Sequence, residues 1–231
     1  MSVTWERFAT VVHGTVESVA RDTVTLTTID GLRIAADVET VPVDVPVLGA
    51  VTLAHPHPLY GGDRFNPVIA TLMERLPRLG FHTLRFDFRG VNESEGVHDD
   101  GDGERLDVAA SIDWLSTLVD DVTHGGVWVV GYSFGAVVGL SVVEPRVEGW
   151  VAIAPPLSSE RRVLSSVDPR PTLIAVPQHD QFCPPARVDE ITSDWTNTEV
   201  VEVTTVDHFL AGRIDDTARL VGDWLVTRVS G

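Results

Sequence analysis

A glycine-flanked serine near the middle of the chain constrains the fold more than any other segment. Residues 131–135 read GYSFG, after an apolar run at 126–130 and before a helix-compatible run at 136–140. The G-x-S-x-G pattern is typical of a sharp strand-to-helix turn, because the glycines let the strand and the helix approach closely. It therefore predicts an α/β protein in which the Ser133 hydroxyl is exposed at the end of a strand.

A reactive serine needs partners, because its hydroxyl is a weak nucleophile at neutral pH. One partner must accept its proton and another must orient that base. On open α/β sheets such groups gather at the carboxyl ends of strands, and here the acid and then the histidine should follow the serine. Asp180 follows the strand-like run 171–176, and His208 follows the β-rich run 200–205. We predict Ser133 as nucleophile, His208 as general base and Asp180 as the orienting acid.

Two alternatives to this triad stay open. His179 adjoins Asp180, but it precedes the acid and adjacent side chains point in different directions, which makes it the weaker base. Asp207 can serve as the acid only if the chain folds back sharply before His208. The other histidines are expected away from the catalytic edge, as surface or packed residues: His13, His82, His98 and His124.

Attack by the serine places negative charge on a substrate carbonyl oxygen, and preorganised backbone N–H groups stabilise that charge. One donor should be Phe134, directly after the serine. The other should come from the loop at 55–62, HPHPLYGG. Proline has no N–H, so His57 is the first choice and Leu59 the second.

The spacing of His55 and His57, with Asp63 nearby, also fits a metal site. We disfavour it because prolines stiffen this loop and no further ligand cluster follows. No metal and no other cofactor is predicted.

Several motifs together resemble one known family. They are HPHP at 55–58 with GG at 61–62, RFDFRGVNESEG at 85–96, GDGE at 101–104 with Asp107 and the Trp114-Leu115 pair, and the serine turn. Over about residues 48–226 the chain resembles the small, lidless bacterial α/β-hydrolases, predicted serine hydrolases or esterases related to dienelactone hydrolases and to serine aminopeptidases. The resemblance implies the fold and the triad class but no substrate. Pro177 and Asn92 stand where such families often have glycine.

The expected architecture is one α/β-hydrolase domain over residues 1–231, with a mostly parallel central sheet and helices on both faces. Alternation at 8–40, with turn signals at Arg21-Asp22 and Asp30-Gly31, predicts a leading antiparallel ribbon. One helix should begin after the cap Asn66 and stop at Gly80. Another is predicted at 103–119.

No cap domain is expected over the site, because only residues 155–170 separate two predicted strands. That length allows a loop and a short helix. The pocket should therefore be open. Its expected apolar walls are Tyr60, Phe134, Pro156, Leu157, Phe182 and Phe209, and its expected polar contacts are Arg64 and Asn66.

Composition argues against some classes of binding partner and favours one cellular compartment. The formal charge of -17 over 231 residues argues against nucleic acid and anionic membrane surfaces, which would repel the protein. No apolar run is long enough for a membrane span, and the N-terminus lacks the regions of a signal peptide. A cytoplasmic location is expected. The lone cysteine, Cys183, excludes an internal disulfide, and the oligomeric state stays open.

These features predict a serine hydrolase that cleaves small carboxylic esters, or thioesters, through an acyl-enzyme. A small-molecule ester is the expected partner. A small-peptide peptidase and an acyltransferase are alternatives on the same scaffold. A non-catalytic binding protein is a less favoured alternative, because the serine, aspartate and histidine are all in place.

Overall fold

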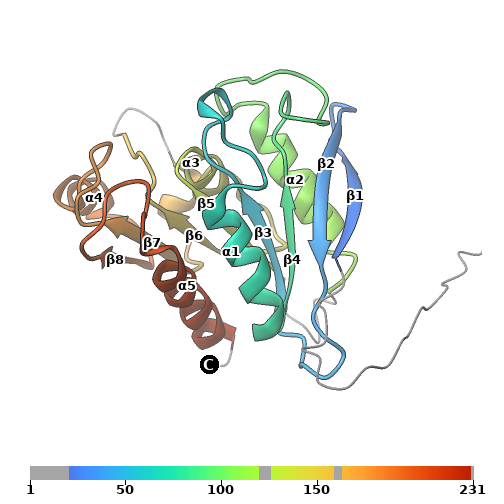
Figure 1. The fold of residues 1–231 in the computed structure, drawn as a ribbon. Helices are drawn as coiled ribbons and strands as arrows, with labels where there is room; N and C mark the ends of the chain where they lie inside the picture. The colour runs from blue at the N-terminus through green and yellow to red at the C-terminus, as the bar shows by residue number, and fades with distance from the viewer. Residues whose placement is uncertain (1–20, 120–125, 159–162, 230–231) are drawn as a thin grey trace, which may run out of the picture.

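The computed structural model describes residues 21–119, 126–158 and 163–229, and a mostly parallel sheet runs through them (Figure 1). Its strand order is β1-β2-β4-β3-β5-β6-β7-β8. Strands β3 to β8 are parallel, whereas β2 pairs antiparallel with both β1 and β4. The strands are β1 Arg21–Thr27, β2 Arg33–Glu39, β3 Gly49–Ala54, β4 Phe81–Phe86, β5 Val127–Tyr132, β6 Val147–Ile153, β7 Thr172–Pro177 and β8 Thr198–Val203. The predicted α/β architecture is confirmed.

The leading antiparallel ribbon is present as the β1–β2 hairpin. Its reversal lies at the expected Asp30-Gly31 turn, where Gly31 has a φ of 88°. The turn expected at Arg21-Asp22 is wrong, because both residues lie inside β1 and pair with β2. Their charged side chains are exposed on an edge strand, a position that tolerates charge. Residues 8–20 of the expected ribbon lie outside the described residues.

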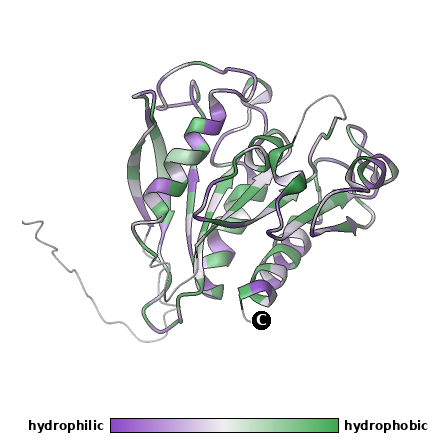
Figure 2. Ribbon diagram, turned by 180° about the vertical axis from the view of Figure 1, so that it is seen from behind, coloured by the Kyte–Doolittle hydropathy of each residue, from purple (hydrophilic) through white to green (hydrophobic). Residues whose placement is uncertain are grey.

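Helices cover both faces of the sheet (Figure 1). The helices are α1 Pro67–Arg75, α2 Glu104–Leu115, α3 Phe134–Leu140, α4 Pro185–Thr192 and α5 Ile214–Val229. Helices α1 and α5 pack in one apolar core, and α2, α3 and α4 pack in the other. The hydrophobic colour follows the central strands, while α2 and α5 carry both colours, as expected of helices with one face in solvent (Figure 2).

The sequence predicted where the α1 segment begins and stops, but for α2 it predicted only the beginning. The Asn66 side chain accepts the Val68 N–H and Pro67 occupies the first helical position, as predicted. A 3-10 turn, Leu76–Leu79, then leads to Gly80, whose φ of 97° ends the segment. Helix α2 begins as expected but ends at Leu115, short of residue 119.

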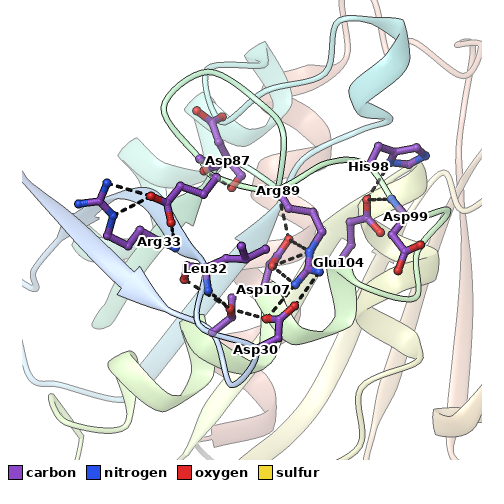
Figure 3. Close-up of polar contacts among 12 residues, drawn as sticks. Asp30, Leu32, Arg33, Asp87, Arg89, His98, Asp99, Glu104 and Asp107 are labelled. Carbon is purple, nitrogen blue, oxygen red and sulfur yellow. Dashed lines mark hydrogen bonds and ion pairs between the residues drawn. The ribbon is translucent and has the colours of Figure 1, made fainter.

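A buried arginine ties the hairpin to the carboxyl edge of the sheet (Figure 3). The Arg89 guanidinium donates to both oxygens of Asp107 in α2 and to Asp30 in the hairpin turn. Burial raises the pKa of Asp107 to about 6, although its bonds to Arg89 oppose the shift. Arg89 follows β4, so this cluster fixes the path of the chain between β4 and α2.

The connection from β6 to β7 is short, as expected of a chain without a cap domain. Its only helical element among the described residues is a 3-10 turn, Leu164–Val167. Residues 159–162 lie outside the described part. Nowhere in the described ranges is a helix both long and apolar enough to cross a bilayer.

Candidate active site

Ser133 occupies a strained turn between β5 and α3. Its φ is 55° and its ψ is -117°, a combination that costs energy for a residue other than glycine. The Ser133 N–H donates to the Ile153 carbonyl on β6 at 2.8 Å, which anchors the turn. A Cβ at Gly131 would lie 2.3 Å from the Gly135 carbonyl oxygen, and a Cβ at Gly135 would lie 2.3 Å from that of Ala54. The close approach of strand, helix and β3 therefore requires both glycines.

The structure brings together the three side chains of the predicted triad. The Ser133 Oγ lies 2.9 Å from the His208 Nε2, and the His208 Nδ1 lies 2.8 Å from the Asp180 Oδ2. The second Asp180 oxygen accepts the N–H groups of Phe182 and Cys183 at 2.8 and 3.1 Å. Asp180 and His208 are both buried. Through these contacts Asp180 holds the imidazole with Nε2 directed at the serine.

Tyr132 supports the histidine in a way that sequence reasoning missed. Its hydroxyl donates to the His208 carbonyl at 2.9 Å. Burial, with the nearby charges of Asp180 and Asp207, raises the pKa of Tyr132 to about 12, so the hydroxyl stays protonated and can donate. Tyr132 is a variable position of the G-x-S-x-G pattern, and no sequence signal marks it.

The alternative triad members lie elsewhere. The His179 side chain is exposed, and its backbone N–H donates to the Val206 carbonyl. Asp207 is also exposed, and its carboxylate accepts the Phe209 N–H within its own loop. Neither side chain forms a hydrogen bond with Ser133 or His208 among the contacts of the described residues.

The two expected oxyanion donors both have available N–H groups. Within the described part of the chain, neither the His57 nor the Phe134 N–H donates to another protein atom. The Leu59 N–H, the second choice, instead donates to the His57 Nδ1 at 3.3 Å. Burial, and then the neighbouring His98, lowers the pKa of His57. This arrangement favours His57 over Leu59 as the second donor.

His55 fixes the start of the loop at 55–64, which we call the oxyanion loop because it contains the expected donor His57. Its Nδ1 donates to the Pro56 carbonyl at 2.6 Å, and its Nε2 accepts the Phe88 N–H at 3.0 Å. Burial lowers the pKa of His55 to about 4, so the ring is neutral and has one donor and one acceptor. Both ring nitrogens are used, which leaves none for the alternative metal site with His57 and Asp63. In the described ranges, no group of three or more potential ligand side chains is placed to hold a metal ion.

Arg64 is not placed as a substrate contact. It is buried, and its guanidinium pairs with Asp87 and Asp37 while its N–H donates to Asp87 at 2.8 Å. Asn92 also donates to Asp87, from a left-handed conformation with a φ of 47°. Asparagine is one of the few residues other than glycine that adopt this conformation readily. Arg64 therefore anchors the oxyanion loop to β2 and to the segment that follows β4.

Ser133 and His208 open into a cavity of about 1150 Å³. Four of the five expected substrate contacts line it, namely Tyr60, Leu157, Phe182 and Phe209, and Arg64 does not. Asn66 and Ser158 add polar groups to the wall. The described lining residues include no aspartate, glutamate or arginine. The described part of the cavity wall is therefore largely apolar and carries no acidic or arginine side chain.

His98 lies near this site, contrary to the expectation that it would lie away from it. Its ring centroid is 4.9 Å from that of His57 and 5.4 Å from that of Phe134. The loop between β4 and α2 brings it there. Sequence periodicity carries no information about the path of such a loop, so the sequence could not predict that His98 lies near His57 and Phe134.

Comparison with known proteins supports the fold over nearly the whole chain. An α/β serine hydrolase homologue from Coxiella burnetii has a TM-score of 0.78 and 28% identity, and the match covers 90% of this chain and 96% of that one. XC6422 from Xanthomonas campestris, described as an α/β serine hydrolase without lid, has a TM-score of 0.77 and 27% identity, with coverages of 93% and 97%. The uncharacterized protein RP471 of Rickettsia prowazekii is 28% identical over 184 residues, covering 75% of this chain and 76% of the relative.

A family model gives the assignment. The model for X-Pro dipeptidyl-peptidases of the S15 family matches residues 30–165, more than half of the chain. This region contains the oxyanion loop and Ser133 and ends before Asp180. The chain is thus a small α/β-hydrolase that belongs to the X-Pro dipeptidyl-peptidase (S15) family.

Proposed function

We propose that this protein hydrolyses small, neutral carboxylic esters, and thioesters of similar size, through an acyl-enzyme. The observation that carries the proposal is the chain of contacts from Ser133 through His208 to Asp180, at 2.9 and 2.8 Å, at the wall of an apolar cavity. Distances of this size are those at which a base can take the proton of a nucleophile.

The proposed reaction follows from the positions of these groups. The Ser133 Oγ attacks the ester carbonyl while His208 accepts the serine proton, and the His57 and Phe134 N–H groups stabilise the oxyanion. His208 then protonates the departing alcohol, which leaves the acyl group on Ser133. Water, deprotonated by His208, attacks the acyl-enzyme and releases the acid. Asp180 stabilises the imidazolium in both halves of the reaction.

The cavity wall favours esters over peptides with a free amino end. A dipeptidyl-peptidase must bind the charged α-ammonium group of its substrate, and a buried charge needs a partner. No carboxylate lines the cavity among the described residues. Membership of the S15 family nevertheless makes an X-Pro peptidase the specific alternative.

The test combines labelling with a pair of chromogenic substrates. A fluorophosphonate probe should modify the wild type at Ser133 and leave Ser133→Ala unmodified. The wild type should hydrolyse 4-nitrophenyl butyrate much faster than glycyl-prolyl-4-nitroanilide. Faster release from the anilide would replace the ester proposal with the peptidase, and an unlabelled wild type would favour a binding protein.

A further inference from the structure

Three aromatic rings form a triangle behind the oxyanion hole. The centroid of His57 lies 4.7 Å from that of Phe134, and the His98 centroid lies 4.9 Å from His57 and 5.4 Å from Phe134. Two of these rings belong to the residues whose N–H groups face the developing charge in the proposed reaction. They come from the β3–α1 loop and the start of α3, so no backbone continuity fixes one against the other. His98 contacts both.

A buried carboxylate lies against the His98 ring (Figure 3). The His98 Nδ1 lies 2.7 Å from the Glu104 Oε1 but outside hydrogen-bond geometry, and the Glu104 side chain is fully buried. Glu104 also accepts the N–H groups of Asp99 and Gly101 at 3.0 and 2.8 Å. It is the first residue of α2, where a negative charge is favourable. Glu104 therefore connects the ring, its loop and the helix end through one side chain.

We propose that His98, beside Glu104, is a positioning residue of the oxyanion hole, which packs against His57 and Phe134 so that their N–H groups converge on one oxygen. The proposal rests on the proposed function, because it assigns the oxyanion hole to these two residues. It also gives a role to the GDGE motif, which the triad leaves without one. His98 itself does not line the cavity, so it acts through its neighbours and touches no substrate.

The experiment compares wild type with His98→Ala and His98→Phe. His82→Ala is the matched control, because His82 lies at the amino end of β4, away from the catalytic edge. Each protein is assayed with 4-nitrophenyl butyrate and with an alkyl trifluoromethyl ketone. The Ser133 Oγ adds to the ketone carbonyl, its proton passes to His208, and the carbonyl oxygen becomes an oxyanion. The inhibition constant therefore measures the oxyanion hole.

Loss of a direct donor lowers kcat by about 10²- to 10³-fold, so loss of a supporting ring should lower it by about tenfold. We expect this in His98→Ala, with KM changed by less than about twofold, because the interaction forms only in the transition state. Inhibition by the ketone should weaken in parallel. His98→Phe keeps the ring and should restore most of both losses, whereas His82→Ala should match the wild type.

The outcomes separate this inference from the proposed function. Fluorophosphonate labelling of wild-type Ser133 tests the proposed function and does not depend on His98. An unlabelled wild type overturns both the proposed function and the role of His98. A labelled wild type whose ketone affinity is unchanged in folded His98→Ala overturns the role of His98 only. A purely structural role would lower the melting temperature of His98→Ala while the folded fraction kept its ketone affinity, and this result also overturns it.

Discussion

At the scale of single residues, the site depends on a few side chains whose orientation is fixed by hydrogen bonds. The Asp180 carboxylate is held on one oxygen by two backbone N–H groups and faces His208 with the other. The Tyr132 hydroxyl holds the backbone of His208. His208 is therefore restrained at its ring by Asp180 and at its backbone by Tyr132, and a base fixed in this way is preorganised for proton transfer.

The first prediction concerns the triad. Ser133→Ala and His208→Ala should each lower kcat on 4-nitrophenyl butyrate by about 10⁶-fold, because triad members act as a unit. Both variants should keep the circular dichroism spectrum of the wild type. His179→Ala is the matched control, since this neighbouring histidine is exposed, and it should retain wild-type activity. Loss of activity in His179→Ala, with activity kept in His208→Ala, would assign the base to His179.

At the scale of elements, the oxyanion loop is attached to the sheet at two points. His55 joins the end of β3 to the segment after β4, and Arg64 pairs with Asp87 in the same segment. A Cβ at Gly62 would lie 2.1 Å from the Pro56 carbonyl oxygen, so the loop between these points folds tightly on itself. The expected donor at His57 thus sits on a rigid support, although it belongs to a loop.

A second prediction follows from His55, which is buried in its neutral form. Burial lowers its pKa from 6.5 to about 4. Between these values the unfolded chain binds a proton that the folded chain excludes, so acidification favours unfolding. His55 should lower the free energy of unfolding by up to roughly 3 kcal/mol as the pH falls from 6.5 to 4.

Urea unfolding at a series of pH values, for wild type and His55→Gln, measures this contribution. Glutamine offers an amide NH₂ as donor group and a carbonyl oxygen as acceptor, and it does not titrate in this range. The variant should be less stable at pH 7, and its stability should fall less steeply below pH 6.5. Parallel curves for the two proteins would show that His55 does not carry the acid sensitivity.

At the scale of the whole molecule, the residues at the carboxyl ends of strands were more predictable than the paths of the loops. Ser133, Asp180 and His208 each follow a strand-like run, and parallel strands bring their carboxyl ends to one edge. The position of His98 depends on a long loop, and that of Arg64 on Asp37 in β2 and Asp87 just after β4. Such contacts arise only when the sheet forms, so local patterns contain no signal for them.

The last prediction concerns substrate size, and it depends on the short connection between β6 and β7 and on the cavity beside Ser133. Lid-bearing lipases respond to an oil–water interface because a lid must move, whereas the described residues between β6 and β7 form only a loop and a 3-10 turn. The cavity is open to solvent, so a long acyl chain is covered less completely than it would be under a lid and gains less per methylene from burial. We expect kcat/KM on a 4-nitrophenyl ester series to be higher for acetate and butyrate than for palmitate, with no rise above the solubility limit. A preference for palmitate, or activation at the interface, would mean that the connection between β6 and β7 works as a lid.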